Sequence, residues 1–97
     1  MPDKTFKISI ATPEKSIFDG EASSLIAPGK SGYFGVLVDH APLIALLGPG
    51  KITIKYGTSG STVFDCRSTG ILEVLKNNVS ILIEDSISMV DDAEIAR

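Results

Sequence analysis

The sequence predicts an all-β protein, a sandwich or a barrel of short strands. Apolar and polar residues alternate in one segment after another, which is typical of a strand with one buried face. Turn residues interrupt this alternation about every eight to twelve residues. The connections leave no room for the crossover helices that a parallel sheet requires, so we expect the sheets to be mostly antiparallel.

The chain begins with a strand, a turn and two further strands. Residues 5–11 alternate apolar and polar side chains, and the threonine-proline-glutamate sequence at 12–14 is typical of a turn. After it we expect a short strand at 15–18. An aspartate-glycine pair at 19–20 then predicts a hairpin turn, and a returning strand follows at 21–27.

The rest of the chain frames a bent midsection, residues 27–50. Glycines and prolines are dense there, and the segment carries the only histidine, His40. Glycine permits backbone angles that other residues avoid, whereas proline restricts its own, so we expect the path to bend repeatedly. Residues 33–38 are predicted as a strand, while 43–47 are too short for periodicity to distinguish helix from strand. The turns beside residues 33–38 should be exposed, which favours a recognition surface.

The second half of the chain is again rich in strands until its tail. Four strands are predicted, at 51–56, 61–67, 70–75 and 79–83. Acidic residues in the segment 88–97 stand where a helix N-terminus favours them. We therefore expect one β-sandwich domain at 1–87, followed at 88–97 by the start of a helix or a frayed tail.

Composition limits the classes of function. A chain of 97 residues, 43% hydrophobic and 22% charged, indicates one globular domain. The net charge of -3 argues against nucleic-acid binding, which normally needs a basic patch. No secretory signal is recognised, and the longest apolar run, 41–47, is far shorter than the roughly 18 residues of a membrane span, so we expect no direct membrane insertion. The single cysteine, Cys66, is expected to be a buried thiol in a strand.

Three combinations of residues suggest chemistry, and each lacks a necessary part. The glycine-lysine-serine sequence at 29–31 matches the end of a phosphate-binding loop, but Ser24 stands where that loop needs a glycine, and a strand follows in place of a helix. His40 follows Asp39, yet adjacent residues of an extended chain point to opposite faces. His40 and Cys66 lack local partners at the spacing of metal ligands. We expect no catalytic residue, cofactor, metal site or small-molecule substrate.

Several motifs occur together in an order that is specific to one family. They are T-P at 12–13, I-F-D-G at 17–20, A-P-G-K-S-G-Y-F-G-V-L-V-D-H-A-P-L at 27–43, G-P-G at 48–50, G-I-L-E-V at 70–74 and N-N-V-S-I-L at 77–82. With these motifs the chain resembles the epsilon subunit of F-type rotary ATP synthases over essentially its whole length. The resemblance implies the N-terminal β-sandwich of that subunit, two sheets of about five strands packed face to face.

The resemblance also implies a function. The chain would be a non-catalytic central-stalk (rotor) subunit of a proton- or sodium-translocating synthase, linking the gamma subunit to the c-ring and coupling ion flow to ATP synthesis. It would lie peripherally on the cytoplasmic face of a bacterial inner membrane, or on the equivalent face of an energy-coupling organelle membrane. Family members usually continue into a C-terminal helical hairpin, so we expect this chain not to inhibit through such an arm.

Contact residues follow from the same resemblance. The gamma-facing residues would be Thr12, His40, Ala41, Pro42 and Ala45. The residues facing the c-ring would be Gly29, Lys30, Ser31, Gly32 and Tyr33. The family often has an acidic side chain at the position of Tyr33, which changes the contact chemistry here. The alternative interpretation is an unrelated β-sandwich module for protein interaction, with no affinity for the synthase.

Overall fold

Ten β-strands form the part of the protein that the structure describes. The structure is a computed structural model, and it describes residues 4–58 and 60–91. In chain order the strands are β1 (Phe6–Ala11), β2 (Ser16–Ala22), β3 (Ser24–Gly29), β4 (Gly32–Leu37), β5 (Leu43–Leu47), β6 (Gly50–Lys55), β7 (Ser61–Cys66), β8 (Gly70–Leu75), β9 (Asn78–Ile83) and β10 (Ile87–Asp91). Within the described ranges there is no helix that could cross a membrane. The predicted all-β class is confirmed.

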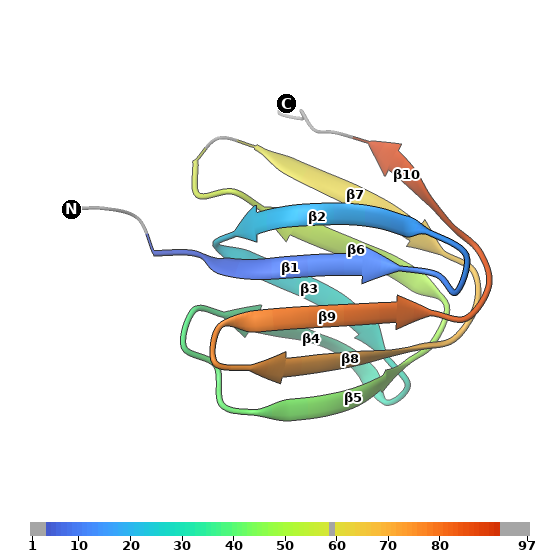
Figure 1. The fold of residues 1–97 in the computed structure, drawn as a ribbon, viewed down its shortest axis with the longest axis horizontal. Helices are drawn as coiled ribbons and strands as arrows, with labels where there is room; N and C mark the ends of the chain where they lie inside the picture. Colours follow the sequence, from blue (N-terminus) through green and yellow to red (C-terminus); the bar gives the residue numbers. More distant parts are fainter. Residues whose placement is uncertain (1–3, 59, 92–97) are drawn as a thin grey trace.

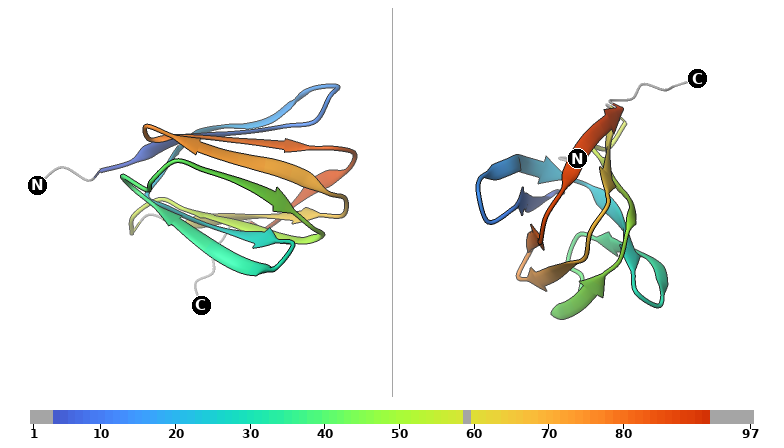
Figure 2. Two further views of the ribbon diagram at one scale, coloured as in Figure 1. Left: turned by 90° about the horizontal axis from the view of Figure 1, so that it is seen from below. Right: turned by 90° about the vertical axis from the view of Figure 1, so that its right-hand side faces the viewer.

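The strands form one continuous curled sheet (Figure 1). Their order is β10-β7-β6-β3-β5-β8-β9-β1-β2, and β4 pairs with β3. The pairs are antiparallel except for β1 with β9, which is parallel. Strands β10, β7, β6, β3 and β4 form one half, and β5, β8, β9, β1 and β2 form the other. The halves face each other (Figure 2), so the two expected five-stranded sheets are halves of a single sheet.

The two halves are joined at β3. The first three residues of β3 pair with β6, whereas its last residue, Gly29, pairs with Leu47 at the end of β5. Beside this pair the Gly48 N–H donates a hydrogen bond of 2.9 Å to the Pro28 carbonyl. Proline has no N–H, but its carbonyl still serves the sheet here. One strand therefore belongs to both halves, and we call this junction the seam.

A glycine is required next to the seam. Gly50 has φ of +156°, and a Cβ there would lie 2.6 Å from the Tyr33 hydroxyl oxygen and 2.7 Å from Cβ of Pro28. The same hydroxyl accepts a hydrogen bond of 3.0 Å from the Lys51 N–H. The Tyr33 hydroxyl therefore lies against the backbone of Gly50, in the space that a side chain at residue 50 would occupy.

The core lies between the halves and is filled by alternate residues of the facing strands. Ile8 of β1, Ile52 of β6 and Leu72 of β8 belong to one buried apolar cluster. The rings of Phe18 and Phe64 pack edge to face with centroids 5.7 Å apart, a favourable aromatic geometry. The alternation that predicted strands in the sequence is the alternation of buried and exposed side chains in the structure.

Cys66 is part of this core. It is 1% exposed, and its Sγ donates a hydrogen bond of 3.0 Å to the Ser68 carbonyl. Burial raises the pKa of the Cys66 thiol, and the charge of the neighbouring Asp65 carboxylate raises it further. The prediction of a buried thiol in a strand is confirmed.

The predicted hairpin at residues 19–20 is wrong. Strand β2 runs through Asp19 and Gly20, which pair with Ser9 and Ile8 of β1. The ladder with β1 uses the backbone of the dipeptide, and this tertiary pairing overrides its local turn preference. The chain turns at Ser23 instead, between β2 and β3.

The structure also decides the form of two further segments. Residues 43–47, for which the pattern allowed helix or strand, form β5. The tail does not start a helix at residue 88, because β10 pairs antiparallel with β7 and so extends the domain beyond residue 87. A short helix would be unstable alone, whereas a strand here gains a sheet partner. The helix expected over 92–97 lies outside the described residues.

We expect Gly50→Ala to destabilise the protein by about 2–4 kcal/mol, because it adds both a strained φ and a steric clash. The matched control is Gly35→Ala in β4, where a Cβ would meet only the Leu25 carbonyl oxygen at an ordinary 3.6 Å. Urea unfolding of both variants measures the difference. Equal stability of the two would contradict the close packing at the seam.

The native protein should protect Cys66 from thiol reagents. Labelling with a chromogenic disulfide at pH 8 should be at least about 100-fold slower in buffer than in denaturant, because the thiol is reached only when the protein opens.

The raised pKa of Cys66 also makes the stability of the protein depend on pH. Stability from the protonated thiol is complete below the unfolded-state pKa, near the ordinary 9.0, and is lost as pH rises through the folded-state pKa. Cys66→Ala should lack this loss of stability at alkaline pH. Rapid labelling of the thiol in the native wild type would contradict its burial.

Candidate functional site

The five residues predicted to face the c-ring lie together at the turn between β3 and β4, where Gly29 ends β3 and Gly32 begins β4. Gly29 pairs with Gly32 across this turn, and a Cβ at Gly29 would lie only 2.8 Å from the Gly32 carbonyl oxygen. Lys30 is exposed, and Tyr33 is 60% exposed. With Ala45 of β5, the turn lines a hollow of about 470 Å³. Ala45, expected on the gamma-facing side, therefore lies beside the predicted c-ring residues.

The remaining residues of the predicted gamma-facing set lie at opposite ends of the molecule. Thr12 is in the β1–β2 turn, and β1 ends beside the end of β9, to which it is parallel. Residues 40–42 follow Asp39, which is hydrogen-bonded to Asn77 just before β9 begins. Six residues of β9 separate the two places, about 20 Å at strand spacing. Figure 1 shows the β1–β2 turn and the β4–β5 connection at opposite ends.

An apolar row that was not predicted from the sequence crosses the outside of the sheet at the end that carries the β1–β2 turn, since its Leu82 pairs with Ala11 of β1. Leu46, Ile71 and Leu82 are partners across β5, β8 and β9 and point outward, 58%, 46% and 51% exposed. Ile44, two residues before Leu46 on the same face of β5, is 71% exposed. These strands therefore carry apolar side chains on both faces, whereas a half-buried antiparallel strand normally has a polar outer face. We call Leu46, Ile71 and Leu82 the apolar row.

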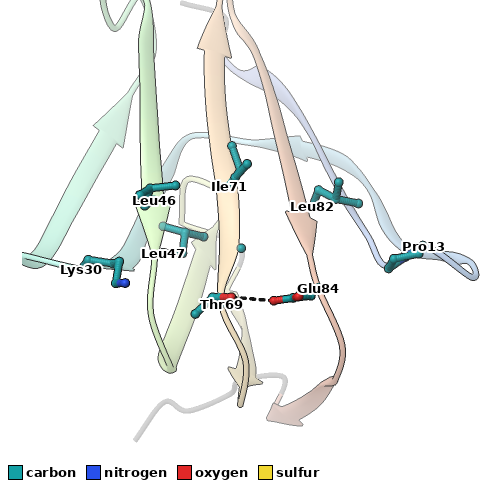
Figure 3. A pocket seen from close by; sticks show the side chains of 9 residues that line it. Pro13, Lys30, Leu46, Leu47, Thr69, Ile71, Leu82 and Glu84 are labelled. Carbon is teal, nitrogen blue, oxygen red and sulfur yellow. Dashed lines mark hydrogen bonds between the residues drawn. The ribbon is translucent and has the colours of Figure 1, made fainter.

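A cleft of about 420 Å³ lies along the apolar row (Figure 3). Lys30 stands at one side of it and Pro13 at the other, so the β3–β4 and β1–β2 turns meet the same cleft. The Thr69 hydroxyl donates a hydrogen bond of 2.8 Å to the Glu84 carboxylate at its lower rim. The arrangement is an apolar floor with a polar rim, as at the centre of protein interfaces.

Asp39 and His40 of the midsection are engaged in structural contacts. The Asp39 carboxylate accepts a hydrogen bond of 2.8 Å from the Asn77 side-chain amide, while His40 Nδ1 lies 2.7 Å from the Ala41 carbonyl oxygen. The two neighbours therefore use separate partners and do not form a proton-transfer pair. Among residues 4–58 and 60–91, no group of three or more potential metal-binding side chains is present.

Comparison with known proteins identifies the domain. A family model described as the ATP synthase delta/epsilon chain, beta-sandwich domain, matches residues 5–89. The chain belongs to this family. The resemblance seen in the sequence motifs is confirmed, and the alternative of an unrelated interaction module is excluded.

Curated relatives of this family match most of the chain. An ATP synthase epsilon chain of Leptospira interrogans (strain Fiocruz L1-130) is 37% identical over 98 residues, which covers 100% of this chain and 76% of the relative. An ATP synthase epsilon chain of Chlorobium limicola is 41% identical over 83 residues, covering 86% of this chain and 93% of the relative. The match therefore extends through both halves of the curled sheet.

Solved structures share the fold of this epsilon-type chain. One is a chain of the Euglena gracilis mitochondrial ATP synthase, with a TM-score of 0.80 at 18% identity. The match covers 92% of this protein and 55% of that chain. Another is a chain of the Tetrahymena thermophila mitochondrial ATP synthase, from a structure of the central stalk and c-ring, with a TM-score of 0.69 at 20% identity. This second match covers 90% of this protein and 68% of that chain. At these identities the likeness concerns the fold.

The signal for the apolar row was present in the sequence of the epsilon-type chain. Antiparallel strands with one buried face usually carry polar residues on the outer face, yet positions 46, 71 and 82 carry leucine or isoleucine. Their alignment into one row depends on the register of three strands, which sequence periodicity does not give.

Proposed function

We propose that this chain is a non-catalytic subunit of the central stalk of an F-type ATP synthase, where it links the gamma subunit to the c-ring. The observation that supports this role best is the exposed apolar row with its cleft, on a domain of the ATP synthase delta/epsilon family. An exposed patch of this kind is typical of a protein-binding surface. The chain thus contributes contacts and stiffness to the rotor rather than bond-making chemistry.

The gamma subunit is the proposed occupant of the apolar row. The apolar row lies at the Thr12 end of β9, because Leu82 pairs with Ala11 of β1, whereas the predicted gamma-facing residues 40–42 lie at the other end. A partner that covers the row would meet Thr12 directly, and one that also extends about 20 Å along β9 would reach residues 40–42. Burying one leucine or isoleucine fully contributes about 1.5–3 kcal/mol, so three such side chains can supply the centre of an interface.

The turn at residues 29–33 is the proposed contact with the c-ring. It projects from the seam, and its exposed Lys30 and Tyr33 can bind the polar loops of the ring. In this role the protein is peripheral to the membrane, on the cytoplasmic face in a bacterium or on the equivalent face in an organelle.

Reconstitution tests the proposed function. The chain is added to a synthase that lacks its epsilon chain, and ATP-driven ion pumping into vesicles is compared with ATP hydrolysis. We expect the chain to co-purify with gamma and the c-ring and to increase ions pumped per ATP. Failure to co-purify, with no change in coupling, would overturn the proposal.

The apolar row should dominate gamma binding. We expect Ile71→Asp to raise the dissociation constant for gamma about 10- to 100-fold, because a charge would be buried at the centre of the interface. Its own fold should persist, since the side chain is half exposed. Met89→Asp is the matched control, because Met89 is 58% exposed on β10 in the other half. Titration calorimetry and thermal melts of both variants decide; equal affinities would show that gamma docks elsewhere.

A further inference from the structure

A pair of side-chain hydrogen bonds joins the two turns that flank the beginning of β9. The Asp39 N–H donates to Oδ1 of Asn77 at 2.7 Å, and Nδ2 of Asn77 donates to Oδ1 of Asp39 at 2.8 Å. Asp39 lies in the β4–β5 connection and Asn77 in the β8–β9 turn, 38 residues apart in the chain. We call this reciprocal pair the clasp.

Both members of the clasp have left-handed backbone conformations. φ is +67° at Asp39 and +61° at Asn77, a region that residues with a Cβ enter at a cost. Aspartate and asparagine tolerate it better than most other residues. The neighbouring Lys76 also has a positive φ, +51°, as expected for a two-residue hairpin turn. Turn geometry explains the conformations of Lys76 and Asn77, but nothing in the β8–β9 turn itself requires an amide aimed at Asp39.

Asn77 also anchors a third segment. Its carbonyl accepts a hydrogen bond of 2.9 Å from the Lys7 N–H at the start of β1. On the other side of the clasp, the His40 N–H donates to the Leu37 carbonyl at 3.2 Å, which closes the turn leading to residues 40–42. The position of residues 40–42 is thus defined relative to β1, β8 and β9 through one asparagine, whose side chain bonds Asp39 and whose main-chain carbonyl bonds Lys7.

We propose that Asn77 is a positioning residue for partner binding: the clasp holds residues 40–42 in the orientation in which they meet gamma. This inference rests on the proposed function and adds to it a residue outside the predicted contact set. A connecting segment that is ordered before binding loses less conformational entropy when the complex forms. The clasp therefore raises the affinity for gamma by ordering residues 40–42 before binding, and Asn77 itself need not contact gamma in the complex.

The test uses the complete chain titrated with the gamma subunit of the same synthase. Asn77→Gly removes the amide but keeps the Asn77 carbonyl bond to Lys7, and glycine readily adopts the positive φ. We expect about a tenfold rise in the dissociation constant with a melting temperature close to that of the wild type. Lys76→Gly is the matched control in the same turn, because it keeps both bonds of the clasp, and its affinity should stay within about twofold of the wild type.

An exchange of the two side chains provides the rescue. Asn77→Asp alone sets a carboxylate against the Asp39 carboxylate and should weaken binding, because like charges repel at this distance. Adding Asp39→Asn restores a donor opposite the new carboxylate, so the double variant D39N/N77D should recover most of the lost affinity. Hydrogen exchange of the Asp39 amide in the free chain should be faster in N77G and unchanged in K76G.

The outcomes separate this inference from the proposed function. If the wild-type chain does not bind gamma, the proposed function fails and the role of Asn77 fails with it. If the wild type binds but N77G binds as tightly as K76G, or the exchanged pair recovers nothing, the clasp has no positioning role while the proposed function stands.

Discussion

Backbone hydrogen bonding at the seam is the constraint on which the rest of the structure depends. Strand β3 pairs with β6 at its start and with β5 at its end, so a single strand closes the two halves over the core. Close approach of Gly50, Pro28 and Tyr33 makes this possible. The turn that follows projects from this closely packed junction. A contact surface supported in this way keeps its shape when force passes through it, as a rotor part requires.

The half of the sheet that contains β5, β8 and β9 differs from the seam, because apolar side chains are exposed on its outer surface. Strands β5, β8 and β9 contribute side chains to the core from one face and present Leu46, Ile71 and Leu82 on the other. The cost of exposing these groups is recovered only when another protein covers them. The core is therefore filled from within the chain, whereas the apolar row is the surface that the proposed interface with gamma would cover.

Particular elements show where sequence reasoning succeeded and failed. The strand at the N-terminus and the buried Cys66 were predicted correctly because one strand's alternation and one residue's polarity are local properties. Asp19 and Gly20 misled the prediction because pairing with β1 outweighs a dipeptide preference. The tail misled it because acidic residues suggested a helix, while the open edge of β7 offered a partner for β10. The contact residues assigned from resemblance remain a proposal.

The sequence by itself determined the class of the fold, the identity of most strands, the alternating residues that form the core and the family to which the chain belongs. These follow from periodicity and motifs, which are written along the chain. Only the tertiary structure decided that the halves join at β3, that three apolar residues form one row, and that Asp39 meets Asn77. Each of these depends on strand register and on contacts between distant segments, and a shift of one residue in register would bring different side chains together.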